Sequence, residues 1–379
     1  MSYKIHFSFD LWTSPNHRSF LALVAHWVSS EGQLVTTTLG FRRLQGSHSG
    51  ANQAELFWKI LHLYQLRERL GYFTTDDVSN NDPALSEIQR LSQLEGIKFD
   101  AIECRVCCFG HIINLVVKTF LWGAQFEIFE HKVETLEEIR PKSELLEAWR
   151  KRGPLRKLHN IATWILRSPQ RRERFATVVK QQLPDSPVLV PHVGNATRWH
   201  SDVDALERAF VLRVPLDGFV ALAAKEERQR IGRRRKAKDN YSENDNEQDP
   251  EYVSTDELTL DDWEDLKVLS TIIELFKRVS LYLQGMSTNR NHANGYLSQI
   301  LPVMDELLSH LQDAKTCYAD PNIYSSHIAT SINHAGKILD KYRLYIYLFI
   351  LAIVLLLLTY VLLSDTTDLR TFPKSCMPQ

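Results

Sequence analysis

The stretch "GYFTTDDVSNN", residues 71–81, decides the fold. A β-branched and aromatic run ends at Asp76 and Asp77, and Ser and Asn residues follow. This pattern is typical of a strand that ends in a polar turn. Such a strand would place its carboxylates at its own C-terminal end, where they could form half of a metal site.

The sequence on either side predicts an α/β sheet. Three strand-like runs come first, and helices and strands then alternate. A three-stranded meander followed by this alternation predicts a sheet with mixed strand directions. The predicted strands are residues 4–12, 19–30, 33–44, 70–76 and 99–108, and the predicted helices are 49–66, 83–94 and 111–122.

Asp10 is the partner that this topology offers to Asp76. Asp10 lies late in the first predicted strand, and Asp76 ends the fourth. If the first three strands form a meander, the fourth can lie beside the first, and two carboxylates can then share a Mg²⁺ ion. Two such ions could support phosphodiester chemistry. The alternative is that Asp10 is a turn acid and Asp76 a helix N-cap.

Downstream of the sheet the chain is predicted to be mostly helical. We expect helices within 125–225, a disordered charged linker at 226–256 and further helices within 257–343. The linker begins with a basic run that contains Arg233, Arg234 and Arg235. This run is either a phosphate-contacting or nuclear-localisation segment, or a solvated linker.

The segment from Leu344 to Ser364 contains no charged residue, Gly or Pro. A helix of this length spans a hydrocarbon core of ~30 Å, so the segment is a predicted transmembrane helix, with a buried core helix as the alternative. Lys341 and Arg343 precede it, which would place the N-terminal part in the cytosol. Residues 365–379 form a tail.

Charge and cysteine content add two limits. The net charge is −1, so any basic surface that contacts nucleic acid must be local. The sequence shows no N-terminal signal peptide, so the five cysteines are predicted to be reduced thiols. Cys104, Cys107, Cys108 and His111 raise a zinc alternative, but four ligands within eight residues cannot easily close a tetrahedron.

"TRWHS", residues 197–201, places Arg198 beside Trp199. Arg can contact a phosphate and Trp can stack on a base, which makes both residues candidates for DNA binding. The alternative is a Trp that packs beneath a helix.

Several motifs together resemble the hAT family of DNA transposases, in the form common among fungal elements. They are "FSFDLWTSPNHRSFLALVAHW", "GYFTTDDVSNNDPAL", "CCFGHIINLVVKTFLWG" and "NATRWHS", and the similarity continues through "GPLRKLHN", "LTLDDWEDL" and "LDKY". The resemblance covers nearly all of residues 5–342. It implies a ribonuclease-H-like fold with a helical insertion domain, of which 1–124 is the N-terminal core part, 125–225 the start of the insertion and 257–343 its later region.

The resemblance also implies roles for single residues. Asp10 and Asp76 match two of the three acidic residues of a metal-dependent site that cleaves and rejoins DNA. Asp77 and Val78 stand where the family usually shows Asn and Ala. Cys108 and His111 match a C-x-x-H motif near that site, and the resemblance implies that Trp199 is an aromatic residue that holds a displaced base.

Three family features are not found: the catalytic Glu motif, the BED-type zinc finger and the C-terminal dimerisation region. We therefore expect a truncated, catalytically inactive transposase derivative in the nucleus that could keep DNA binding but not oligomerisation. Mg²⁺ would be its cofactor by resemblance, or no cofactor if it is inactive. Two alternatives stay open: a tail-anchored membrane protein with a transposase-derived cytosolic domain, and an active metal-dependent nuclease.

Overall fold

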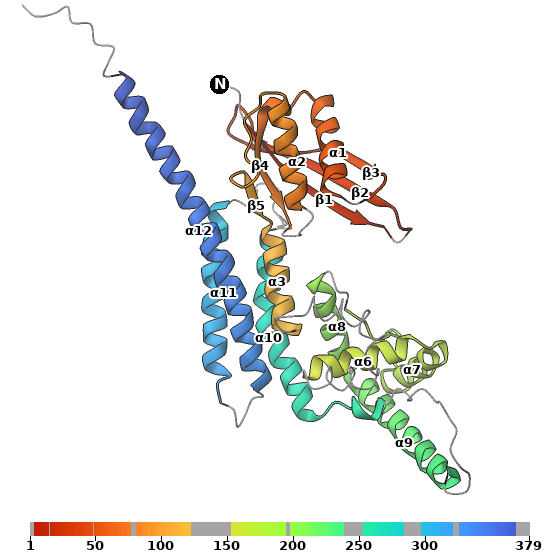
Figure 1. The fold of residues 1–379 in the computed structure, drawn as a ribbon. Helices are drawn as coiled ribbons and strands as arrows, with labels where there is room; N and C mark the ends of the chain where they lie inside the picture. Colours follow the sequence, from red (N-terminus) through yellow and green to blue (C-terminus); the bar gives the residue numbers. More distant parts are fainter. Residues whose placement is uncertain are drawn as a thin grey trace, which may run out of the picture. The chain divides into compact units, whose positions relative to one another are not determined.

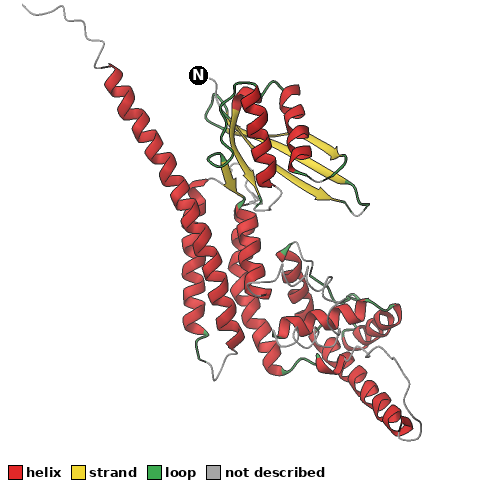
Figure 2. Ribbon diagram, viewed as in Figure 1, coloured by secondary structure: helices red, strands yellow, loops and turns green. Residues whose placement is uncertain are grey.

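The computed structural model describes residues 4–14, 16–47, 49–76, 81–122, 153–194, 198–238, 253–283, 297–320 and 326–368. The chain forms two compact units that divide within helix α3 (Phe109–Trp122), between Ile113 and Asn114. The described part of the first unit is α/β, and that of the second is helical (Figures 1 and 2).

The first unit is built on a mixed sheet, in which the described strands have the order β3-β2-β1-β4-β5. β1, β2 and β3 form an antiparallel meander, while β4 pairs parallel with β1 and β5 pairs parallel with β4. The predicted meander, and the predicted position of the fourth strand beside the first, are confirmed. The strands are β1 (Ile5–Thr13), β2 (Ser19–Val28), β3 (Leu34–Leu44), β4 (Leu70–Thr75) and β5 (Arg105–Cys107).

Alternation along the strands gives the sheet one apolar face. This face packs against α1 (Gly50–Leu63) and α2 (Asn81–Leu94), which lie on the same side of the sheet (Figure 1). Phe57 of α1 contacts Phe7 of β1 and Phe73 of β4, with ring centroids 5.6 Å and 5.2 Å apart. The two helices approach so closely that a Cβ at Gly50 would lie 2.6 Å from backbone atoms of α2.

The fifth strand is shorter than predicted. Residues 99–108 read as one strand, but only Arg105–Cys107 pair with β4. The carboxylate of Asp100 accepts hydrogen bonds from the backbone N–H groups of Ile102 and Glu103, at 2.8 Å and 2.9 Å. This local turn takes residues 101–104 out of the ladder, as Asp side chains commonly do.

The regular elements in the described part of the second unit are all helical. α11 and α12 form a hairpin (Figure 1), and α10 contacts α6, α8 and α11. The elements are α6 (Pro154–Leu166), α7 (Pro169–Gln182), α8 (Trp199–Val211), α9 (Arg213–Lys238), the 3-10 turn η2 (Val253–Thr255), α10 (Leu260–Leu283), α11 (Leu297–Cys317) and α12 (Ser326–Asp368).

A buried ion pair joins α3 to α8. Lys118 Nζ lies 2.8 Å from Asp202 Oδ2, and the two side chains are 1% and 2% exposed. The indole N–H of Trp122 donates to the same carboxylate oxygen at 3.1 Å. Burial raises the pKa of Asp202, and the Lys118 ammonium and the Trp122 N–H counter this rise. Removing one partner would leave the other charge buried and unpaired, so the pair fixes how these helices meet.

Helix α6 packs its polar residues against the same Trp122. Arg156 donates to the backbone carbonyl of Trp122 and holds its guanidinium 4.2 Å above the indole ring. His159 meets the indole edge-on, with centroids 5.7 Å apart. Burial first, and then the charges of Arg156, Lys118 and Arg167, lower the pKa of His159 to about 4.

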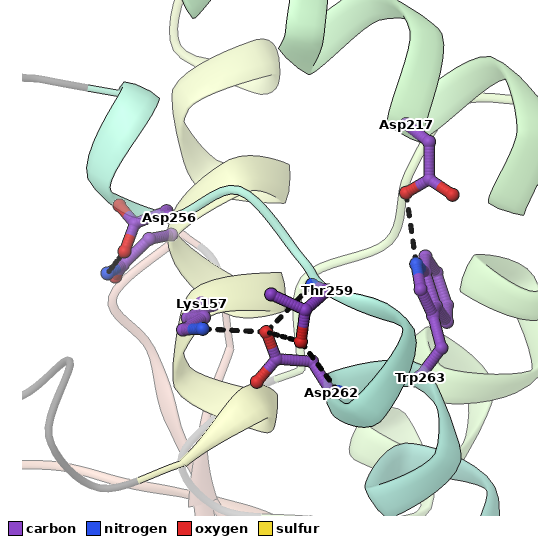
Figure 3. Close-up of polar contacts among 7 residues, drawn as sticks. Lys157, Asp217, Asp256, Thr259, Asp262 and Trp263 are labelled. Carbon is purple, nitrogen blue, oxygen red and sulfur yellow. Dashed lines mark hydrogen bonds and ion pairs between the residues drawn. The ribbon is translucent and has the colours of Figure 1, made fainter.

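The start of α10 is held by a capping box (Figure 3). Asp262 Oδ2 accepts from the N–H and hydroxyl of Thr259 at 2.8 Å and 3.0 Å, while Thr259 Oγ1 accepts from the Asp262 N–H at 3.1 Å. Lys157 of α6 reaches the same carboxylate at 2.6 Å. The buried Trp263 donates to Asp217 of α9 at 3.0 Å. The N-terminal end of α10 is therefore bound to both α6 and α9.

The charged segment at 226–256 differs from the disordered linker that the sequence predicts. Residues up to Lys238 continue α9, and Glu227 accepts from the backbone N–H of Ser254 at 3.2 Å. Asp256 is buried and accepts from Asn160 at 3.2 Å. Tertiary contacts of these few acidic residues order the two ends of the segment, although its composition is polar. Residues 239–252 lie outside the described residues.

The predicted transmembrane segment, Leu344 to Ser364, falls within α12. Among the described residues, no helix combines the length and the apolar character that crossing a bilayer requires. The side chains from Ala352 onward lie outside the described residues, so the membrane span stays a prediction.

We expect Asp262→Ala to lower the free energy of unfolding by about 1–2 kcal/mol, because it removes the cap of α10 and its contact with Lys157. Urea denaturation measures the change. Asp261→Ala is the matched control, since Asp261 is an exposed acid in the same first turn. Equal losses in the two variants would contradict this role of the cap.

The low pKa of His159 predicts that stability falls in acid. Because the folded-state pKa of His159 is about 4, against an ordinary histidine pKa of 6.5, the unfolded chain binds more protons between these values. Stability should therefore decrease as pH falls from 6.5 to 4, with about 3 kcal/mol coming from this residue.

His159→Phe should flatten that decrease, because the ring that packs on Trp122 then no longer titrates. The measurement is the unfolding free energy against pH, whose slope is informative even if the variant is less stable overall. Part of the slope should remain, because burial and Arg156 also lower the pKa of His327. If the slope is unchanged in His159→Phe, the loss of stability in acid does not come from His159.

Candidate functional site

The strand register brings Asp10 and Asp76 together. In the parallel pairing of β1 with β4, Ser8 is the partner of Thr74. Asp10 follows Ser8 by two residues, and Asp76 follows Thr74 by two. Since side chains alternate along a strand, both carboxylates lie on the face of the sheet opposite α1 and α2, near the C-terminal ends of these strands. Asp10 is exposed and Asp76 is half-buried.

Polar side chains extend along this face toward the other end of the strands. The backbone N–H of Tyr72 donates to His6 Nδ1 at 3.1 Å, and the two rings stack 5.5 Å apart. Ser8 Oγ is hydrogen-bonded to His26 Nε2 at 2.9 Å, and His26 Nδ1 to Thr36 Oγ1 at 3.1 Å. Burial lowers the pKa of both His6 and His26.

The pair of aspartates suits a divalent cation in its residue types. Carboxylate oxygens are the ligands that Mg²⁺ prefers, and an exposed position lets the ion keep its waters. Among the described residues, no group of three His, Cys, Asp or Glu is arranged to hold a metal ion. Asp77 and Val78, which depart from the family pattern, lie outside the described residues. The described site therefore consists of two carboxylates.

The cysteine cluster lies at the next strand. Cys107 is buried and pairs with Thr75 of β4, and the backbone N–H of Cys108 donates to the Thr75 carbonyl at 2.8 Å. Cys108 and His111 are half-buried at the start of α3, and they form no metal-binding group with Cys104 and Cys107. The geometry gives no support to the zinc alternative. It places Cys108 beside the end of β4, the strand that Asp76 follows.

Trp199 is not on the surface of the helical unit. Its side chain is 2% exposed, and its backbone N–H donates to Asn114 Oδ1 at 3.0 Å. A displaced base could reach this ring only if the packing opened, so the sequence expectation of a base-stacking Trp199 does not fit the folded unit. Arg198 is exposed at the N-terminus of α8.

The predicted basic run lies at the end of α9. Arg233 is exposed there, whereas the side chains of Arg234 and Arg235 are outside the described residues. DNA contact by this run stays a prediction.

The sequence reasoning missed an aromatic cluster on the same sheet face as Asp10. Trp12 of β1, Phe20 of β2 and Phe41 of β3, here called the aromatic platform, lie with ring centroids 5.2–6.1 Å apart. Phe20 and Phe41 are stacked, with an interplanar angle of 14°. The sequence does contain a signal for this cluster. Trp12 follows Asp10 by two residues, so the two side chains share a face of the sheet, and Phe20 and Phe41 lie on the same face of the two neighbouring strands.

Comparison with known proteins agrees with this architecture. Residues 8–99 match the family described as the ZBED1 RNase-like domain. The chain is 24% identical over 337 residues to the putative transcriptional regulator tpeD of Talaromyces stipitatus, an alignment that covers 89% of this chain and 35% of that protein. It is 28% identical over 111 residues to the putative AC transposase of Zea mays, which covers 29% of this chain and 14% of that protein.

A second maize protein, the putative AC9 transposase, is also 28% identical over 111 residues, and the alignment covers 13% of its length. The chain thus spans about a third of the fungal relative, at 35%, and about a seventh of the maize proteins, at 14% and 13%. The matched residues hold most of the mixed sheet, and the chain is similar in sequence to putative transposases and to a putative transcriptional regulator.

Proposed function

We propose that this protein is a transposase-derived DNA-binding protein whose ribonuclease-H-like sheet holds DNA near Asp10 and Asp76 without cutting it. The carrying observation is the register of β1 and β4, which sets these two aspartates on one face, near the ends of adjacent parallel strands. The similarity to transposases and to a putative transcriptional regulator supports DNA as the partner.

The two carboxylates would hold a divalent cation that bridges the protein to a DNA phosphate. Such an ion is needed because two carboxylates alone repel a phosphate. Cleavage has a further requirement, because charge on the attacking and leaving oxygens must be neutralised together in the transition state. Two carboxylates suffice to hold a bridging cation but not to neutralise this charge, so we propose that the site binds DNA without cleaving it.

DNA binding is expected to depend on divalent cations. With Ca²⁺ or Mg²⁺ present, the full chain should bind labelled DNA more tightly than in chelator, because the ion screens Asp10 and Asp76 from the phosphates. The double variant Asp10→Asn, Asp76→Asn should bind equally well with and without the ion. Fluorescence anisotropy at fixed ionic strength measures both.

Glu31→Gln is the matched control, because it removes one negative charge from an exposed turn away from the pair. Its cation dependence should equal that of the unmodified protein. If the double variant keeps the full cation dependence, the aspartates are not the bridging groups. If no DNA binds at low salt with either ion, the proposed function is wrong.

Cleavage is tested separately with supercoiled plasmid in Mg²⁺ and in Mn²⁺. We expect no nicking above the level of a protein-free reaction. Asp76→Ala serves as the diagnostic variant: nicking by the unmodified chain that disappears in Asp76→Ala, but survives in Glu31→Gln, would show that the site is an active nuclease.

A further inference from the structure

The aromatic platform lies next to the acidic pair on the sheet face that α1 and α2 leave uncovered. In the antiparallel registers, Asp10 faces Ala22, and Ala22 faces Phe41. The next row holds Trp12, Phe20 and Arg43, again paired across the three strands. The platform therefore begins in the row of Asp10 and continues toward the β1–β2 turn.

The platform rings are exposed to an extent that is unusual for large aromatic residues. Phe41 is 54% exposed and Trp12 is 36% exposed, while Phe20 is half-buried between them. Exposed aromatic rings that contact one another form an apolar surface, and monomeric proteins seldom keep such a surface without a use for it. Phe20 and Phe41 stack on each other and Trp12 is tilted against both, and aromatic rings of this kind can stack with a planar partner.

Positive charge lies beside this surface. Arg43 is exposed in the same row as Trp12 and Phe20. Arg18 is exposed in the turn between β1 and β2, where its backbone N–H donates to Ser14 Oγ. Guanidinium groups beside aromatic rings fit a ligand that carries both phosphates and unpaired bases.

We propose that the aromatic platform binds a single-stranded segment of DNA, with bases stacked on Trp12 and Phe41 and phosphates near Arg43 and Arg18. A duplex hides the faces of its bases within the stack, so this surface favours unpaired nucleotides. A strand that lies on the platform would continue along the sheet face to Asp10 and Asp76. The inference rests on the proposed DNA binding and adds the form of DNA that the site takes.

The test compares the full chain and its variants on two labelled probes, an oligothymidylate of about 20 nucleotides and a duplex of the same length. We expect the unmodified protein to prefer the single strand. Phe41→Ala and Trp12→Ala should each weaken single-strand binding about ten-fold, with a smaller effect on the duplex. Phe41→Trp should restore binding, since it keeps a ring face.

Two controls match these changes. Leu63→Ala removes an exposed apolar side chain, 66% exposed, at the end of α1 on the other face of the sheet. Lys98→Glu reverses an exposed charge in the loop before β5, for comparison with Arg43→Glu. The controls should bind both probes like the unmodified protein, and Arg43→Glu should weaken single-strand binding with a reduced salt dependence.

The outcomes separate the two proposals. Unchanged single-strand affinity in both Phe41→Ala and Trp12→Ala, or a preference for the duplex, would overturn the platform while leaving DNA binding intact. If neither the single strand nor the duplex binds at low salt, both the proposed function and the proposed role of the aromatic platform are wrong. Thermal unfolding of each variant shows whether a loss of binding reflects a loss of the fold.

Discussion

The arrangement of the helical unit depends on a charged pair that water does not reach. Lys118 interrupts an otherwise apolar run in α3, and it can be buried there only because Asp202 of α8 lies against it. The pair also constrains the backbone around it: a Cβ at Gly194 would lie 1.9 Å from the Asp202 carboxylate, so the chain can pass this point only as glycine. The buried carboxylate of Asp202 thus fixes how α3 and α8 meet and constrains the backbone at Gly194.

The motifs that resemble those of transposases therefore have two different structural roles. The "GPLRKLHN" stretch supplies Arg156 and His159, and Asp202 directly follows "NATRWHS"; all three residues pack around Trp122. These contacts lie inside the helical unit. The "FSFDLW" and "GYFTTD" stretches instead place carboxylates on strands at the surface of the sheet. A motif match by itself does not distinguish a packing residue from one that meets a ligand, whereas burial does.

The sheet shows the same contrast between its two faces. One face is closed by α1 and α2 around an aromatic core, and this closure gives the first unit its stability. The other carries histidines, aspartates, exposed aromatic rings and an arginine. Because strands alternate their side chains, a single strand such as β1 supplies both faces: Phe7 and Phe9 enter the core, while Asp10 lies on the other side.

The sequence by itself determined the mixed sheet, its meander and the neighbourhood of Asp10 and Asp76, because these follow from local periodicity and from the few ways in which such strands can be ordered. It could not decide the shortened β5, the continuation of α9 into a charged segment, or the burial of Trp199. Those features depend on a side chain meeting a partner far along the chain, as Glu227 meets Ser254 and Trp199 meets Asn114. Only the tertiary structure joined Trp12, Phe20 and Arg43 into one surface, because cross-strand register sets which side chains become neighbours and no single strand encodes it.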